Sequence, residues 1–226
     1  MPLNLSVILI RSIVFMICFA PAVFAGNGST FGGLTGMFNV PTAVVLSNNE
    51  QTISLHKYQI KYTYGLHDFM EIGVRTSIEK VTTFEELGRN FSFNFKIRAL
   101  NQDFNFIDLG CGGENTSYFL CLGKTIKELN KMYVTVGTGN GRFNSFFAGF
   151  IVPLDSITEL GGEYDGMDFN AGFRMVLSPK ICFDFYFKGI KKMVVRPYLK
   201  DVINDHVVFG VSYTEHLNID FGGIFK

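Results

Sequence analysis

The sequence predicts an all-β protein, an antiparallel up-and-down barrel of about twelve strands of the type that spans a membrane. Three observations predict it. Apolar and polar residues alternate with period two in many segments, the chain has 25 Phe and no Trp, and the connections between segments are short. Alternation places one set of side chains on each face of a strand. An apolar chain without spanning helices needs a closed barrel to pair all its backbone groups.

The alternation is clearest in FSFNFKIRA, residues 91–99, where Phe91, Phe93 and Phe95 share one face and polar residues share the other. The segments MDFNAGFRMVL and CFDFYFK repeat the pattern further along. The mean hydropathy is positive. After the N-terminal 25 residues, no segment reaches the ~18 consecutive apolar residues that a membrane helix requires.

The segments with strand character are separated mostly by two to eight residues, as in a meander. Phase slips at Lys57-Tyr58 and at Phe106-Ile107 are interpreted as β-bulges. The candidate strands are 51–63, 69–79, 91–100, 103–112, 115–123, 131–139, 144–153, 157–165, 168–177, 181–190, 206–214 and 217–226.

The Phe-rich face is expected to meet lipid, because the other face carries charge. An Arg or Lys at mid-depth in hydrocarbon costs about 2–4 kcal/mol. The alternative is a soluble lipocalin-like or sandwich fold with Phe inside. The number of Phe residues disfavours it, because a soluble core would have to hide most of them within a narrow interior. The charged residues of the expected inner face are Arg75, Lys96, Arg98, Glu163, Asp165, Asp168, Arg174, Asp184 and Lys188.

Residues 1–25 have the features of a signal peptide that directs export through the Sec pathway. Arg11 precedes an apolar core, Pro21 ends the helix, and small residues precede the expected cleavage after Ala25. The alternative is a single membrane anchor. Cleavage leaves a barrel over residues 51–226, preceded by residues 26–50.

Residues 26–50 contain FGGLTGMFNVPTAVVLSNNE, which is apolar but has neither helical nor strand periodicity. Gly33 and Gly36 permit close backbone approach, and Pro41, followed by Thr42 and Ala43, fixes an extended kink. Two interpretations remain open: a plug that folds into the barrel mouth or lumen, and a lead-in that packs against the barrel rim.

Charge and cysteine content exclude several partners and cofactors. The chain has 20 basic and 20 acidic side chains, so no strong field favours nucleic acid. Outside the signal peptide, Cys111, Cys121 and Cys182 form an odd set, which argues against a disulfide framework. Pairing of Cys111 with Cys121 across a hairpin is the alternative to buried free thiols. No CxxC or His-rich cluster predicts a metal site, and no cofactor is expected.

The sequence predicts no catalytic residue, although some outer-membrane barrels hydrolyse lipids. Ser54 lies close to His56 on one candidate strand, but no GxSxG elbow and no paired-carboxylate spacing is present. GTGNGRF, residues 137–143, resembles a phosphate loop only superficially, because it lacks the following Lys-Ser/Thr and lies between strands.

The candidate ligand-binding cluster surrounds GGEYDGMDFN. By strand parity its members face the lumen, where carboxylates need partners; Arg174 and Lys188, or Arg75 and Arg98, are the expected ones. One interpretation is a charge network that rigidifies the lumen, and the other is a polar track for a saccharide. The cluster comprises Glu163, Asp165, Asp168, Asn170 and Arg174.

Three short motifs resemble the YjbH-like family of outer-membrane β-barrels linked to exopolysaccharide biosynthesis. FGGLTGMFNVPTAVVLSNNE resembles the family's N-terminal signature with its Pro-Thr-Ala triplet. VTVGTGNGRF resembles its Gly-x-Gly-x-Gly turn, and GGEYDGMDFNAGFRMVL resembles its EYDG-type hairpin. Together they cover residues 31–177, whereas family members are much longer, so functions of their additional parts are not implied.

The resemblance implies a role in moving or assembling a polysaccharide at the outer membrane. The expected function is therefore a non-enzymatic outer-membrane barrel that assists exopolysaccharide export or surface assembly. The expected partners are outer-membrane lipid, a polysaccharide and proteins of an export machinery. The alternatives are a general small-solute porin and, third, a barrel lipid hydrolase.

Overall fold

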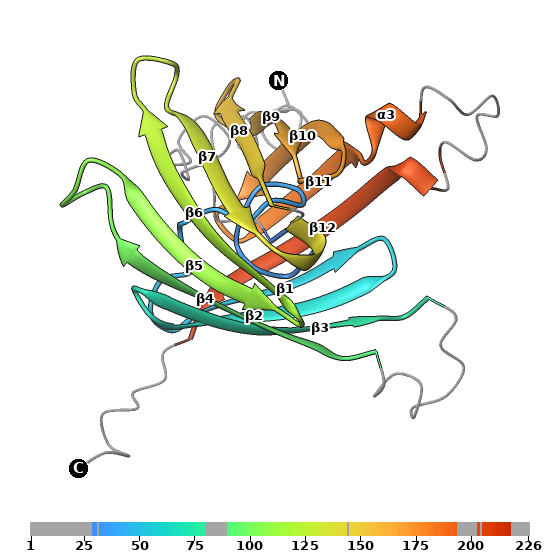
Figure 1. Cartoon of the computed structure of the whole chain (residues 1–226), viewed down its shortest axis with the longest axis horizontal. Coiled ribbons are helices and arrows are strands. Elements are labelled where there is room, and N and C mark those ends of the chain that lie inside the picture. Colours follow the sequence, from blue (N-terminus) through green and yellow to red (C-terminus); the bar gives the residue numbers. More distant parts are fainter. Residues whose placement is uncertain are drawn as a thin grey trace, which may run out of the picture.

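The chain folds into a closed antiparallel barrel of twelve strands in the computed structural model (Figure 1). The structure describes residues 29–30, 32–79, 90–143, 145–193, 203 and 205–217. Each strand pairs with its neighbours in sequence, and β1 pairs with β12 from Glu50↔His216 to His56↔Gly210 to close the ring. The up-and-down barrel predicted from the alternation is thus confirmed, and two stacked sheets are excluded.

The elements follow one another with short connections over most of the chain. They are β1 (Glu50–His56), β2 (Gln59–His67), β3 (Met70–Ser77), β4 (Ser92–Leu100), β5 (Asp108–Glu114), β6 (Ser117–Ile126), β7 (Met132–Gly139), η1 (Gly141–Phe143), β8 (Phe147–Pro153), β9 (Thr158–Tyr164), β10 (Phe169–Ser178), β11 (Ile181–Phe187), α3 (Ile190–Met193) and β12 (Val207–His216).

The strand number is right, but one of the predicted strands is wrong. The segment 51–63 is two strands, because Lys57 and Tyr58 form a tight turn between β1 and β2 where a bulge was expected. The described strands close into a ring through β1 and β12, and residues 218–226 of the predicted strand 217–226 lie outside the described ones. The slip at Phe106-Ile107 is also no bulge, since β5 begins only at Asp108.

The two faces of the barrel have the polarity that the alternation predicts. On β4, Phe93 is 72% exposed on the outer face, whereas Lys96, three residues further along, is fully buried on the inner face. Phe91 and Phe95 also face outward. Large apolar side chains lie exposed around the outside of the barrel on β1 to β4 and β6 to β12.

The connections divide the barrel into two ends. We name one the loop end; it carries the connections 57–58, 78–91, 115–116, 140–146, 165–168 and 188–206. The opposite end, which we name the turn end, carries the connections 68–69, 101–107, 127–131, 154–157 and 179–180. The start of β1 and the end of β12 lie at the turn end.

The structure places residues 29–30 and 32–47 inside the barrel, and we call this segment the plug. Its blue trace runs through the middle of the barrel (Figure 1). Nearly all its described residues are buried, and two isolated bridges, Ser29↔Thr35 and Gly36↔Pro41, fold it back on itself. Inward strand glycines make room for it. A Cβ on Gly110 would lie 2.8 Å from Ala43 Cα, and one on Gly161 would lie 2.9 Å from the Phe38 ring.

Among the described residues, no helix has the length and apolarity needed to cross a membrane.

The β1–β2 turn generates a test of the fold. Lys57 adopts a φ of 53°, a left-handed conformation that costs an L-residue about 1–2 kcal/mol and costs Gly much less. We expect Lys57→Gly to raise the free energy of unfolding by about 1 kcal/mol. The midpoint of urea unfolding of the refolded protein measures this. Tyr58→Gly is the control and should lower the midpoint; a lowered midpoint for Lys57→Gly would contradict the turn.

Candidate functional site

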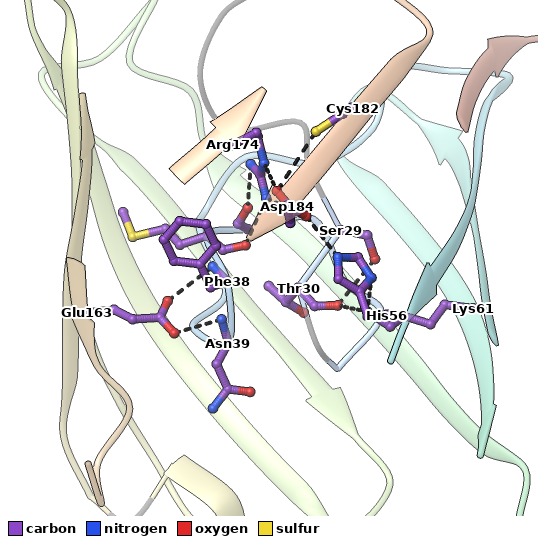
Figure 2. A network of polar contacts seen from close by, with 12 residues as sticks. Ser29, Thr30, Phe38, Asn39, His56, Lys61, Glu163, Arg174, Cys182 and Asp184 are labelled. Atoms are coloured by element: carbon purple, nitrogen blue, oxygen red, sulfur yellow. Dashed lines mark hydrogen bonds and ion pairs between the residues drawn. The ribbon is translucent and has the colours of Figure 1, made fainter. Parts of the chain in front are cut away.

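The carboxylate of Glu163, at the end of β9, holds the middle of the plug. It accepts hydrogen bonds from three consecutive backbone N–H groups, those of Phe38 (3.2 Å), Asn39 (2.7 Å) and Val40 (3.1 Å). The Asn170 amide adds a fourth at 2.9 Å. Figure 2 shows Glu163 beside the plug bend at Phe38 and Asn39. These four donors offset part of the cost of removing the carboxylate from water.

A second carboxylate, that of Glu71 on β3, binds the plug backbone at two positions that are eleven residues apart in sequence. It accepts hydrogen bonds from the backbone N–H groups of Thr35 and Leu46, each at 2.9 Å, and from the Thr35 hydroxyl at 2.8 Å. Lys96 on β4 pairs with Glu71 at 3.2 Å and donates to the Thr35 carbonyl at 2.7 Å. Both charged side chains are completely buried, so each depends on the other and on the plug.

Cationic side chains of β10 and β2 bind further carbonyl groups of the plug. Arg174 on β10 donates to the carbonyls of Gly36 (3.3 Å) and Met37 (3.0 Å) and forms an ion pair with Asp184 on β11 at 2.6 Å. Asp184 also bonds His56 Nε2 at 2.8 Å. His56 Nδ1 lies 2.7 Å from the Lys61 amine, which donates to the Thr30 carbonyl. Figure 2 shows this chain of contacts from Arg174 through Asp184 and His56 to Lys61.

Three apolar clusters fix the plug between its polar contacts. Leu34, Val40 and Ala43 pack against Phe119, Cys121, Phe143 and Phe147 of the wall and the β7–β8 connection. Met37 packs against Tyr133 and Ile151, and Phe38 stacks on Tyr186 with ring centroids 5.0 Å apart. Burial of apolar side chains of this size stabilises by about 1.5–3 kcal/mol each.

The predicted N-terminal motif residues all lie in the plug. Gly33 has a φ of 101°, and its carbonyl accepts from the Thr63 hydroxyl. A Cβ on Gly36 would lie 2.5 Å from the Val40 carbonyl, so the close Gly36↔Pro41 bridge requires glycine there. Thr42 and Ala43 are completely buried.

The predicted polar cluster lies inside the barrel but divides into two groups. Glu163, Asn170 and Arg174 face the plug and are 4%, 1% and 2% exposed. Asp165 and Asp168 lie in the β9–β10 turn at the loop end. The expected cationic partners are wrong for Glu163, because its described partners are plug N–H groups and Asn170.

Asp165 joins the plug to the loop end. Its carboxylate accepts from the side chains of Asn39 (2.6 Å) and Asn170 (3.2 Å) and from the backbone N–H groups of Met167 and Asp168. Burial alone would raise the pKa of Asp165, but these hydrogen bonds to its charged form outweigh burial and hold the pKa below its ordinary value.

A polar pocket of about 500 Å³ opens at the loop end, and we call it the mouth pocket. Its floor includes Asn39 of the plug, held by Arg142 through the side-chain oxygen (2.8 Å) and the carbonyl (3.0 Å). Burial, reinforced by Arg142, lowers the pKa of Lys188 on its wall. The lining residues are Asn39, Gln59, Arg75, Arg142, Asp165, Met167, Asp168, Lys188, Gly189, Lys192, Asp205 and His206.

Sequence reasoning did not single out Glu71, Lys61, Asn39 or Arg142. Glu71 and Lys61 occupy inward positions of β3 and β2, so strand parity could have added them to the lumen set. Asn39 and Arg142 lie outside regular strands, where parity gives no information. The sequence contains no signal that joins Asn39 to Arg142.

The three described cysteines are free thiols. Cys111 pairs in register with Leu120, whereas Cys121 faces the lumen and contacts the plug cluster. Within the described ranges, no three His, Cys, Asp or Glu side chains converge as a metal-binding group. Comparisons with family models and with curated proteins found no match for this chain.

The contacts of Glu163 predict that the plug stabilises the barrel. Glu163→Gln keeps the shape but replaces one oxygen with an NH₂ group facing backbone donors. Hydrogen bonds to charged groups contribute about 1.5–3 kcal/mol, so we expect a loss of that size in unfolding free energy, measured by urea unfolding and by heat resistance on gels.

Glu215→Gln is the matched control, because Glu215 forms an exposed pair with Lys180 at 3.1 Å, and exposed pairs contribute little. Equal stability of the two variants would show that the Glu163 carboxylate does not hold the plug.

Proposed function

We propose that this protein is a plugged, non-enzymatic outer-membrane barrel that assists exopolysaccharide export or surface assembly. One observation carries the membrane part of the proposal: apolar side chains cover the outside of a closed barrel whose inside is charged. Phe93, Phe169 and Phe209 are 72%, 57% and 63% exposed, whereas the inward Lys61 and Lys96 are 1% and 0% exposed. Such a surface is stable in lipid and costly in water.

The lengths of the connections support an orientation in that membrane. Outer-membrane barrels have short periplasmic turns and longer extracellular loops. The two longest connections, 78–91 and 188–206, belong to the loop end, and the ends of β1 and β12 that continue toward the chain termini lie at the turn end. We therefore assign the loop end, with the mouth pocket, to the cell surface.

The filled lumen argues against the porin alternative. A porin keeps a water-filled channel through its barrel. Here the plug occupies the interior and is bound on opposite walls by Glu163 and Glu71 through backbone N–H groups and by Arg174 through carbonyls. Removing it would leave buried charges without partners, at a cost of several kcal/mol each.

The polysaccharide part of the proposal rests on the motif resemblance over residues 31–177 and on the polar mouth pocket. Two of those motifs, the Gly/Pro segment and the EYDG hairpin, are the parts that meet through Glu163 and Asp165. The residues that carry the resemblance in these two motifs therefore contact one another in the fold.

A deletion strain tests the proposed function. We expect it to lose most of its secreted polymer and to regain it when the wild-type gene is restored. The restored protein should pellet with outer membranes and remain there in carbonate. Normal polymer secretion in the deletion strain would contradict the function, and release by carbonate would contradict the location.

Planar-bilayer conductance separates a plugged barrel from a porin. Because the plug fills the lumen, we expect the reconstituted protein to show no steady open-channel current under conditions in which a porin of similar strand number conducts. A stable ohmic conductance of the wild-type protein would favour the porin alternative. The Glu215→Gln variant, which alters only the exposed ion pair with Lys180, controls for damage to the protein during reconstitution.

A further inference from the structure

The mouth pocket contains buried polar atoms that have no hydrogen-bond partner among the described residues. These are Asp168 Oδ2, His206 Nε2 and Gln59 Oε1. Asp168 and His206 are only 5% and 6% exposed. A buried polar atom without a partner costs about 1–3 kcal/mol, so a pocket that holds three of them is built to receive donors.

The acceptor role of His206 follows from its other nitrogen. His206 Nδ1 lies 2.7 Å from the Lys188 carbonyl, which can only accept, so Nδ1 carries a proton. In the neutral ring Nε2 is then an acceptor. Asp168 is fixed in the same way, because its Oδ1 accepts the backbone N–H groups of Phe169 and Lys191 and leaves Oδ2 to the pocket.

Gly189 brings these two acceptors together. A Cβ at this position would lie 3.4 Å from Asp168 Oδ2 and 3.3 Å from His206 Nδ1, and the φ of Gly189 is 70°. Both side chains therefore border the same small space, which any other residue at position 189 would partly fill. The β9–β10 turn and the two ends of the β11–β12 connection thus form one side of the pocket.

The charges around the pocket balance. Its lining carries four cations, Arg75, Arg142, Lys188 and Lys192, against Asp165, Asp168 and Asp205. Glu114 supplies a fourth carboxylate, because it pairs with both Arg75 and Arg142 at 2.7 Å. A site for a phosphate or a carboxylate needs an excess of cations, and the described lining residues together with Glu114 show none.

We propose that the mouth pocket binds a neutral polyhydroxylated ligand, one unit of a saccharide, through hydroxyl groups that donate to Asp168, His206 and Gln59. A hydroxyl group donates and accepts at once, so a sugar ring can also accept hydrogen bonds from cationic side chains of the same walls. The volume of about 500 Å³ is in the range of small-molecule sites. This inference deepens the proposed function, on which it rests for the source of the saccharide.

The plug would form part of this site. Asn39 lines the pocket while its side chain bridges Arg142 and Asp165 and its backbone N–H donates to Glu163. A ligand in the pocket therefore contacts the same residue that anchors the plug bend. We expect bound ligand to raise the urea midpoint, because it binds only the folded barrel.

The test uses the purified full-length barrel in detergent. The neutral probes are the methyl glycosides of glucose, galactose and mannose. Saturation-transfer NMR and titration calorimetry measure their binding. Glucuronate and glucosamine are the charged probes. We expect at least one neutral glycoside to bind more tightly than both charged ones. No binding of any neutral glycoside, or tighter binding of a charged one, would overturn the proposal.

Two pocket variants locate the site. Asp168→Asn keeps the Oδ1 contacts and removes the charged acceptor, and Gln59→Leu removes an acceptor at nearly constant size. Losing one hydrogen bond of about 1.4 kcal/mol weakens binding tenfold, so we expect each Kd to rise about tenfold. Asp155→Asn, in the turn-end connection 154–157, is the matched control and should leave the Kd unchanged.

Unchanged Kd values in both folded pocket variants would place the binding elsewhere and overturn the assignment. The result is independent of the secretion experiment. Binding by the purified barrel with normal secretion in the deletion strain contradicts the proposed function alone, whereas a secretion defect without binding contradicts this inference alone.

Discussion

The rest of the structure depends on one constraint: inside a closed barrel that excludes water, every charge and every backbone polar group needs a partner. The strands pair their backbone groups with one another, but the inward charges of Glu71, Glu163 and Arg174 find no partner on their own strands. The plug has the complementary problem, because an irregular segment pairs only some of its own N–H and C=O groups. Carboxylates on plug N–H groups and cations on plug carbonyls solve both problems together.

Shape complementarity between the plug and the barrel wall makes these contacts possible. The strand glycines Gly110 and Gly161 let the plug approach the wall within a distance that any Cβ would block. Phe38 then fills the space beside Gly161 and stacks on Tyr186. Among the described residues, Phe consequently has two roles: many Phe side chains lie exposed on the outside, whereas a smaller set packs with the plug inside.

Much of the fold could be predicted from local pattern, and the site only in part. Alternation in FSFNFKIRA places Phe93 on one face and Lys96 on the other, because successive side chains of a strand point to opposite faces. The Lys57-Tyr58 turn was missed, because the polar and apolar phase continues across it with one slip and neither residue is a usual turn residue. The pairing of Glu163 with three plug N–H groups joins residues more than 120 positions apart, and no local pattern contains that information.

The β9–β10 hairpin has two roles within six residues. Glu163 points into the lumen and binds the plug backbone, whereas Asp168 points into the mouth pocket and has an acceptor without a partner. Asp165 lies between them and bonds both Asn39 and the backbone of the turn. The two interpretations of the carboxylate cluster, a rigid charge network and a saccharide track, are therefore compatible. The first describes the residues that face the plug, and the second is a property of the residues that face the loop end.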